Sequence, residues 1–219
     1  MLARRLILLF APLALLVSAC GAPEYEYVKN SEQQTYFKVP NDWRQIDQEA
    51  LHEFAVGVDP DSATAQLREQ LMWTVAYDAA EEPSITHIAA PMPFAEPAVW
   101  AKVERLLPEV SSAISLDVLR NLLLPVTEDM RTAAAQADAL YPGFELLRDD
   151  VIVPEKGLHG VRVAYNYQFL GRSTTFDLTA LVNDDASLLY MLLIRCAARC
   201  YTERADELES IATSFTVRS

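Results

Sequence analysis

Two cysteines near the carboxyl end of the chain have the spacing for covalent chemistry with each other. Cys196 and Cys200 stand as C-x3-C, which allows a disulfide across a turn. Such a short loop gives a stabilisation of only about 2 kcal/mol in the chain-entropy treatment. A redox couple would more naturally be C-x-x-C at a helix amino end, and a metal site would need more ligands. We therefore predict a structural disulfide between Cys196 and Cys200, with free thiols, redox chemistry or half a metal site as alternatives.

The third cysteine, Cys20, ends an amino-terminal segment of three parts. Two arginines at positions 4 and 5 precede an apolar run, residues 6–17, and the small residues Ser18 and Ala19 stand directly before Cys20. The run is shorter than the roughly 20 residues of a membrane-spanning helix. The pattern resembles a bacterial lipobox, in which the cysteine receives a diacylglycerol thioether and becomes the first residue of the processed chain. An ordinary secretory signal with an accidental cysteine is the alternative.

A lipid on Cys20 would decide where the domain works. Two or three long acyl chains hold a protein on a membrane effectively permanently. We therefore expect residues 1–19 to be a signal peptide and Cys20 to be the lipidation site. The expected location is the extracytoplasmic face of the cell membrane, where a pair of thiols such as Cys196 and Cys200 tends to oxidise.

The other reactive side chains form no recognisable catalytic or metal pattern. The three histidines, His52, His87 and His159, lack ligand-spaced partners, and the chain contains no G-x-S-x-G, G-x-G-x-x-G or P-loop motif. The acidic stretches at residues 59–61 and 183–185 are better explained as turns than as calcium loops. We therefore predict no catalytic residue, no metal, no cofactor and no enzymatic activity.

A pair of neighbouring carboxylates, Asp149 and Asp150, could in principle serve general acid and base catalysis. Adjacent residues on a strand point to opposite faces of the sheet, so these two would not share a site.

Charge narrows the possible partners. The chain has 51% hydrophobic and 22% charged residues, typical of a globular protein, and a net charge of −13. Removing the two signal-peptide arginines changes this to −15 (−13 − 2). Such a chain should not bind nucleic acid, since phosphates would repel it. For the same reason we expect the domain itself not to lie on anionic lipid head groups.

The elements begin with a polar segment, residues 20–34, which we expect to be a tether, although Tyr25 and Tyr27 could instead begin a strand. Residues 35–219 form the expected single domain. Alternation predicts strands at 35–39, 70–77 and 85–90, and residues 48–56 suit a short helix.

The middle of the chain carries helical spacing. Val99, Val103, Leu106, Leu107 and Val110 fall at i, i+4, i+7, i+8 and i+11, which predicts a helix over 97–110. Further helices are expected at 112–124 and, with Thr127 as N-cap, at 127–140. We therefore predict a helical insertion at about 96–141, forming either a layer on the sheet or a partner surface.

The residue pattern in the final third of the chain predicts strands and then a helix. A strand is expected at 144–153, followed by an antiparallel meander whose last strand, 188–194, is covered on both faces. After Cys200, Thr202 is a candidate N-cap for a helix whose buried face contains Leu208, Ile211 and Ala212, and Phe215–Val217 would close as an edge segment.

The order of strands, helices, strands and helix predicts an α+β fold, an antiparallel β-sheet flanked by helices. The opening Phe37-x-Val39-Pro40-x-x-Trp43 and the closing Ser214-Phe215-Thr216-Val217 resemble the two ends of PsbP/Mog1-like domains. With its amino-terminal signal, the chain is similar to LpqN-type lipoproteins of actinobacteria. The resemblance implies binding or assembly roles in or on membranes, and it brings no shared catalytic residues.

These observations favour a non-enzymatic, membrane-anchored lipoprotein of the cell envelope that presents a binding domain to an envelope protein partner. A carrier of a lipid or small apolar ligand is the alternative, with a cavity between the Val161, Tyr165 and Phe169 face and the helical middle. An enzyme of unrecognised type is a third possibility.

Overall fold

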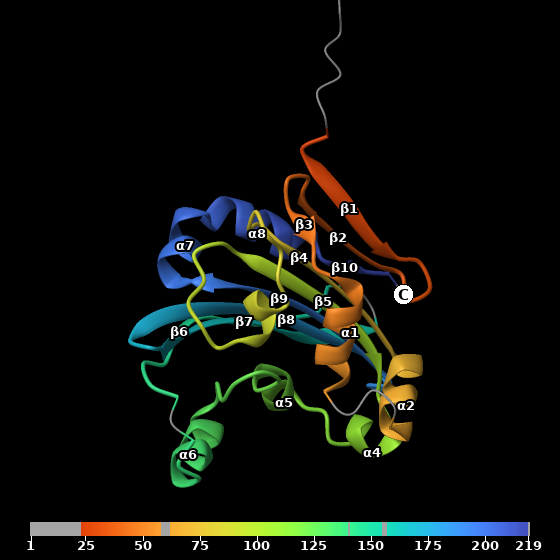
Figure 1. Ribbon diagram of the computed structural model, residues 1–219. Helices are drawn as coiled ribbons and strands as arrows, with labels where there is room; N and C mark the ends of the chain where they lie inside the picture. Colours follow the sequence, from red (N-terminus) through yellow and green to blue (C-terminus); the bar gives the residue numbers. More distant parts are fainter. Residues whose placement is uncertain (1–22, 58–61, 140, 155–156, 219) are drawn as a thin grey trace, which may run out of the picture.

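The structure is a computed structural model that describes residues 23–218, apart from 58–61, 140 and 155–156. The described residues form two antiparallel sheets and eight helices (Figure 1). The larger sheet has the order β3-β4-β5-β9-β8-β7-β6. Its strands are β3 (Arg44–Gln45), β4 (Met72–Asp78), β5 (Ala98–Arg105), β6 (Glu145–Ile152), β7 (Leu158–Phe169), β8 (Arg172–Asn183) and β9 (Leu188–Ala197).

The smaller sheet joins the two ends of the domain. Its order is β1-β2-β10, with β1 (Tyr25–Asn30), β2 (Thr35–Pro40) and β10 (Thr216–Val217). The helices are α1 (Gln48–Val56), α2 (Ala63–Leu71), α3 (Thr86–Ala89), α4 (Pro108–Ser111), α5 (Leu116–Arg120), α6 (Glu128–Gln136), α7 (Ala198–Glu203) and α8 (Ala205–Ser214). The predicted fold class, an antiparallel sheet flanked by helices, is confirmed.

Clusters of buried hydrophobic side chains cover both faces of the larger sheet. On one face, Val161, Val163, Tyr165 and Tyr167 of β7 pack with side chains from α1, α3 and α5. On the other face, the smaller sheet and α8 pack on β4, β5 and β9, and the buried side of α8 contains the predicted Leu208, Ile211 and Ala212. In Figure 1, α7, α8 and the smaller sheet lie above the larger sheet, and α4, α5 and α6 lie below it.

The meander β7-β8-β9 is confirmed as predicted. Leu170 and Gly171 form the first turn, both with positive φ (53° and 75°), as a two-residue hairpin turn requires for strands of right-handed twist. β9 lies between β5 and β8 and is buried along almost its whole length. The predicted disulfide is present between Cys196, near the end of β9, and Cys200 in α7, with the two Cα atoms 6.0 Å apart.

The predicted helix at 97–110 is wrong, because residues 98–105 form β5. β5 pairs with β4 on one side and β9 on the other, so it is a central strand. Val99 and Val103 are four residues apart, and four is a multiple of the strand period as well as close to a helical turn. The two valines therefore share a face in either structure. Only α4, a single turn beginning at Pro108, is helical in this stretch.

Three smaller predictions also need correction. Residues 85–90 hold the short helix α3 and not a strand, and the helix expected at 112–124 is confined to α5. Thr202 lies inside α7, where its hydroxyl donates to the Ala198 carbonyl, so it caps nothing.

The segment expected as a tether is partly folded. Residues 25–30 form β1, which pairs with β2 along its whole length, so the alternative of a strand beginning at Tyr25 is the one observed. Cys20 and the predicted signal peptide lie outside the described residues. None of the helices in the described part of the chain has the length and apolar character needed to cross a membrane.

Candidate binding site

The three histidines lie on three different elements. His87 is half-buried and its Nδ1 lies 2.5 Å from Oδ2 of the buried Asp78. Asp78 also accepts the backbone N–H groups of Ala80 and Ser84, so its contacts hold the loop that follows β4. His52 lies on α1 and His159 on β7. Within the described ranges, no three His, Cys, Asp or Glu side chains gather as a metal site would require.

The two adjacent carboxylates separate as expected. The Asp149 carboxylate accepts a hydrogen bond from Nε of Arg120, on α5, at 2.9 Å. The Asp150 carboxylate instead lies 3.8 Å from the guanidinium of Arg148. Residues 183–185 form the turn between β8 and β9, where the Asn183 side chain accepts the N–H of Leu188. The second acidic stretch, residues 59–61, lies outside the described residues.

A concave site with a mainly apolar lining lies beside α6, at the end of β7. Its floor is aromatic, because Tyr141 and Phe144 pack against Tyr167 with ring centroids 5.8 and 5.4 Å away. Its wall is α6, which contributes Ala134 and Ala135. We call this cavity of about 290 Å³ the α6 groove; it is lined by Pro125, Arg131, Ala134, Ala135, Ala139, Tyr141, Pro142, Phe144 and Tyr167.

One asparagine positions α6. The side-chain oxygen of Asn121 accepts the N–H groups of Val126 and Thr127, and its amide donates to the Thr127 hydroxyl at 2.9 Å. Thr127 stands at the predicted N-cap position, yet its own side chain caps no N–H; Glu128 and Asp129 instead place negative charge in the positive first turn. Asn121 thus holds the start of α6 close to the end of α5.

The polar groups of the α6 groove are few. The Arg131 guanidinium lies 4.3 Å from the centre of the Phe144 ring and its Nε donates to the Val126 carbonyl. Tyr167 donates its hydroxyl to the carbonyl of Pro125. Burial raises the pKa of Tyr167, so the phenol stays neutral. The groove therefore combines alkyl and aromatic walls with one cation, a lining suited to an apolar molecule that carries a negative group.

The helical layer around the groove also exposes large apolar side chains. Met130 of α6 is 45% exposed, and among the described side chains of this helix none is buried. Other large apolar side chains exposed on this layer and on the adjoining strand β6 are Leu107, Val110, Val118, Tyr141, Leu146 and Val151. We call this region the α4–α6 surface. Surfaces of this kind mark interaction sites when the apolar side chains are contiguous.

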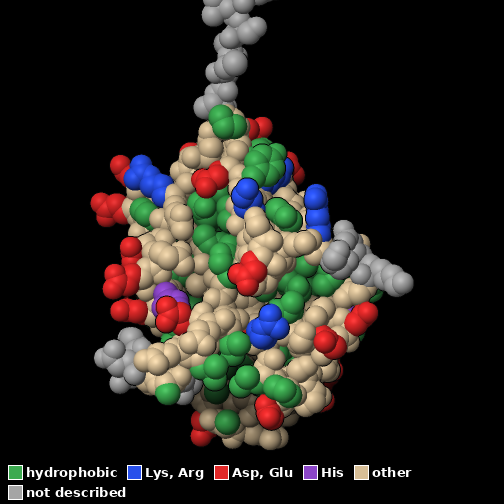
Figure 2. All heavy atoms as spheres, turned by 90° about the vertical axis from the view of Figure 1, so that its right-hand side faces the viewer, with side chains coloured by type: hydrophobic (Ala, Val, Ile, Leu, Met, Phe, Trp, Pro, Cys, Tyr) green, Lys and Arg blue, Asp and Glu red, His purple; other side chains and the backbone are tan. Residues whose placement is uncertain are grey.

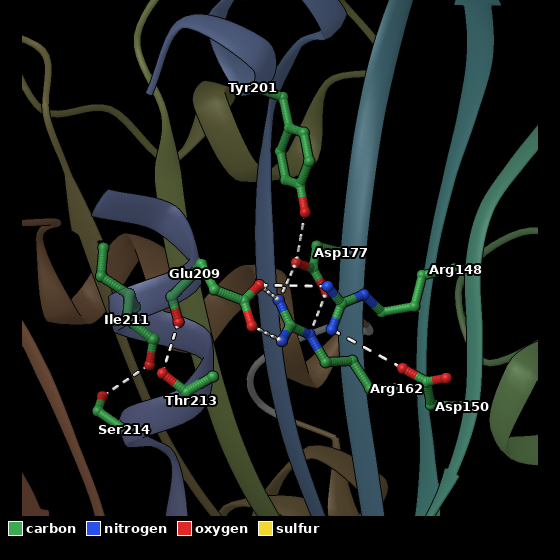
Figure 3. A network of polar contacts seen from close by, with 9 residues as sticks. All are labelled: Arg148, Asp150, Arg162, Asp177, Tyr201, Glu209, Ile211, Thr213 and Ser214. Atoms are coloured by element: carbon green, nitrogen blue, oxygen red, sulfur yellow. Dashed lines mark hydrogen bonds and ion pairs between the residues drawn. The ribbon is translucent and has the colours of Figure 1, made fainter. Parts of the chain in front are cut away.

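On the opposite face of the sheet a polar network joins α8 to β7 and β8 (Figure 3). The Arg162 guanidinium forms a bidentate ion pair with the Asp177 carboxylate, with hydrogen bonds of 3.0 and 2.7 Å. It also donates two hydrogen bonds to the Glu209 carboxylate on α8, at 2.9 and 2.8 Å. Tyr201 of α7 donates to Asp177 at 2.7 Å, and Arg148 reaches Glu209 at 3.4 Å.

The network keeps its charges at neutral pH. Burial alone would lower the pKa of Arg162, but its bonds to Asp177 and Glu209 raise it above the ordinary value. The bond from Arg162 in turn lowers the pKa of Glu209. Burial and then the neighbouring Asp177 raise the pKa of Tyr201. These side chains satisfy one another, so we assign the network to holding α7 and α8 on the sheet.

The strand register carries a signal for this network in the sequence. The predicted turn at Leu170–Gly171 sets the register of β7 and β8, which pairs Arg162 with Thr179. Asp177 then stands two residues away on the same face, a diagonal position within reach of an arginine. What the sequence did not reveal is that α8 covers this face.

A second buried arginine was also missed. Arg195 of β9 donates to the carbonyls of Ile88 and Met92 at 2.6 and 3.0 Å, and lies 5.0 Å from the Phe176 ring centre. Burial lowers its pKa to about 10, so it remains charged at neutral pH. Arg195 ties the segment after α3 to the sheet.

Comparison with known proteins identifies the fold. No protein-family model and no curated protein sequence matches the chain. The chain is similar to the solution structure of CyanoP, the cyanobacterial PsbP of Synechocystis sp. PCC 6803, with a TM-score of 0.51 and 13% identity over 91% of this chain and 96% of that one. At this identity the match shows the fold alone. The chain thus has the PsbP-like fold that the two ends of the domain predicted.

Two further solved structures are similar, with TM-scores below 0.5. One is LpqN of Mycobacterium tuberculosis, described as involved in cell envelope biogenesis (TM-score 0.46, 14% identity, 89% of this chain and 91% of that one). The other is the Ran-binding protein Mog1p of Saccharomyces cerevisiae (0.43, 9% identity, 88% and 95%).

Proposed function

We propose that this chain is a lipid-anchored protein of the cell envelope whose domain binds a partner protein through the α4–α6 surface. The observation that carries the proposal is the position of that surface. It lies at the lower end of the molecule in Figure 1, whereas β1, the first strand after Cys20, lies at the upper right. A lipid at Cys20 would therefore hold the domain by one end and leave the apolar helical layer at the other, accessible from the envelope.

The anchor is tested with Cys20→Ala. Because a lipidated cysteine is held by two or three acyl chains, the unsubstituted chain is expected in the membrane fraction and the variant in the soluble fraction. Cys196→Ala is the matched control, since it removes a cysteine without removing the lipobox. Membrane association of Cys20→Ala equal to that of the unsubstituted chain contradicts the anchor.

The partner surface is tested by photo-crosslinking in intact cells. A photoreactive residue replaces Met130 on the α4–α6 surface, or Arg172 at the β7–β8 turn as a control. We expect one discrete crosslinked species from position 130 and none from position 172. Equal crosslinking from both positions, or from neither, contradicts a specific partner at this surface.

The α6 groove favours a second candidate, the carrier of a small apolar ligand with an acidic group. The supporting observation is an aromatic cavity of about 290 Å³ whose lining contains one cation, Arg131. Native mass spectrometry of the protein purified from its own cells should then show a bound amphiphile.

A filled groove distinguishes the two candidates. Ala135→Trp places a large side chain into the α6 groove, whereas Ala133→Trp lies on the same helix and outside the lining. A carrier loses its ligand in the first variant and retains it in the second. If neither the original chain nor Ala133→Trp carries any ligand, the carrier function is contradicted.

A further inference from the structure

The outer face of the smaller sheet has a composition unlike the rest of this acidic chain. Strand alternation sends Val28, Phe37 and Val39 inward to the core. The residues between them therefore face outward. These are Tyr25, Tyr27 and Lys29 of β1, Tyr36 and Lys38 of β2, and Thr216 of β10, with Arg218 following directly.

The aromatic and cationic side chains of this face are interleaved. The register places Tyr27 opposite Lys38 and Lys29 opposite Tyr36. Nζ of Lys38 lies 3.9 Å from the centre of the Tyr25 ring, and the Arg218 guanidinium lies 5.3 Å from that of Tyr36. Figure 2 looks onto this side of the molecule, where Lys and Arg side chains lie among hydrophobic ones in the upper half of the view.

A shallow groove of about 220 Å³ runs across the face, and Lys29, Lys38 and Arg218 all line it. Glu26 is the single acid among the residues of these three strands, and it accepts the hydroxyl of Tyr77 at 3.1 Å on the inner side. Glu24, Asp206 and Glu207 lie around the Tyr25–Pro40 end of the face, where Glu207 pairs with Arg204. The cations thus occupy the centre and the acids the rim.

The outer face of the smaller sheet lies close to Cys20 along the chain, which favours the membrane as the surface that it contacts. Cys20 precedes Tyr25 by five residues, and an extended chain covers at most about 3.6 Å per residue, so β1 begins within about 18 Å of a lipidated Cys20. Tyrosine side chains favour the membrane–water interface, and lysine and arginine favour anionic head groups. The covalent chain would therefore keep this face close to the membrane that holds the anchor.

We propose that the outer face of the smaller sheet is a membrane-contact surface, lying on the anionic lipid head groups of the membrane that carries the anchor. The proposal rests on the lipid anchor of the proposed function. The overall charge of −15 does not prevent it, because salt screens charges beyond a Debye length of about 10 Å and the groups nearest the head groups are cationic. Each cation should favour the contacting orientation about fivefold.

The test uses the full processed chain in vesicles of phosphatidylcholine with phosphatidylglycerol. A donor fluorophore is attached at Tyr27→Cys, or at Met130→Cys on α6, and acceptors are placed on lipid head groups. We expect strong energy transfer from position 27 and weak transfer from position 130. Vesicles of phosphatidylcholine alone, or high salt, should reduce transfer from position 27.

Charge variants make the test specific. Lys29→Gln with Lys38→Gln should lower the ratio of contacting to free orientations about 25-fold on the mixed vesicles. Arg105→Gln with Arg172→Gln removes two cations from the larger sheet and should leave this ratio unchanged. Equal effects of the two pairs, or equal transfer from positions 27 and 130, would overturn the proposal.

Flotation of the vesicles separates failure of the anchor from failure of the contact. A chain that does not float has no lipid anchor, which overturns the proposed function and with it the contact. A chain that floats but shows weak transfer from position 27 keeps its anchor and overturns only the contact. As a check without substitutions, a membrane-impermeant amine reagent should modify Lys29 and Lys38 more slowly on mixed vesicles than in detergent, and Lys102 equally in both.

Discussion

Arg162 joins α8 to the larger sheet through ion pairs. Its guanidinium is buried between Asp177 and Glu209. Removing one partner of a buried ion pair is far more costly than removing both, because it leaves a charge that water cannot reach. The chain therefore tolerates loss of the pair better than loss of one member.

We expect Arg162→Met to lower the free energy of unfolding by about 3–5 kcal/mol, since Asp177 stays buried without its cation. The double variant Arg162→Met with Asp177→Leu should recover much of that loss. Urea unfolding measures both. Arg199→Met is the control: Arg199 pairs with Glu203 on the exposed side of α7, so its loss should hardly change the urea midpoint. A double variant as unstable as the single one would contradict this account.

Glu209 gives the network a pH dependence. Its pKa is lowered from 4.5 by the bond from Arg162, so its contribution is fully present above pH 4.5 and is lost as the pH falls through the lower folded-state value. The side chain is 42% exposed, so solvent screens the effect and we expect it to be modest. The urea midpoint of Glu209→Gln should lie below that of the original chain at neutral pH and approach it in acid. Glu53→Gln on α1 is the control.

At the scale of elements, strand and turn patterns predicted the later half of the sheet well. The meander could be read because β7 alternates without interruption and Leu170–Gly171 suits a two-residue turn. The helix expected at 48–56 has these bounds in the structure, where Asp47 and Gly57 cap α1. β5 was misread because a strand buried on both faces shows no alternation.

The candidate site was less predictable than the fold. Tyr165 and the helical middle were expected to enclose a cavity, but the α6 groove forms where Tyr141, Phe144 and Tyr167 meet α6. Their contact depends on Asn121, whose role is a matter of loop geometry and has no sequence period. The pairing of Cys196 with Cys200 could be predicted, because a lipidated Cys20 would leave these two thiols as the remaining pair in an oxidising compartment.

The disulfide gives a prediction for the corner between β9 and α7. Reduction should lower the free energy of unfolding by about 2 kcal/mol, because the bridge closes only a short loop. Thermal unfolding with and without a reductant measures this. Cys196→Ala with Cys200→Ala serves as the control and should not respond to the reductant; an equal response of both proteins would assign the effect to something other than the bridge.

At the scale of the whole molecule, charge is distributed in a way that composition conceals. The acidic total led us to expect no contact with anionic lipids, yet the smaller sheet gathers cations on one face. The net charge of the composition averages over the whole surface, whereas a membrane would contact only one face. The strand pairing that creates this side depends on both ends of the chain, since β10 pairs with β2.

Truncation after Ser214 tests that closure. Loss of β10 removes the buried Val217 and leaves one edge of β2 unpaired. We expect a destabilisation of about 2–3 kcal/mol, with faster amide exchange in β2. Truncation after Val217 keeps the pairing and should leave both properties unchanged. If the two truncated chains behave alike, β10 does not secure the sheet.

The Cys196–Cys200 bridge has a consequence for the order of events in the cell. If the chain is exported as proposed, it is first synthesised in the reducing cytosol, where the disulfide does not form. A deficit of about 2 kcal/mol there raises the unfolded fraction roughly 30-fold relative to the oxidised domain. A secretion system that transports unfolded chains would therefore export the reduced chain more readily than the oxidised domain. The disulfide would form after export, so the folded domain would be most stable on the extracytoplasmic side of the membrane.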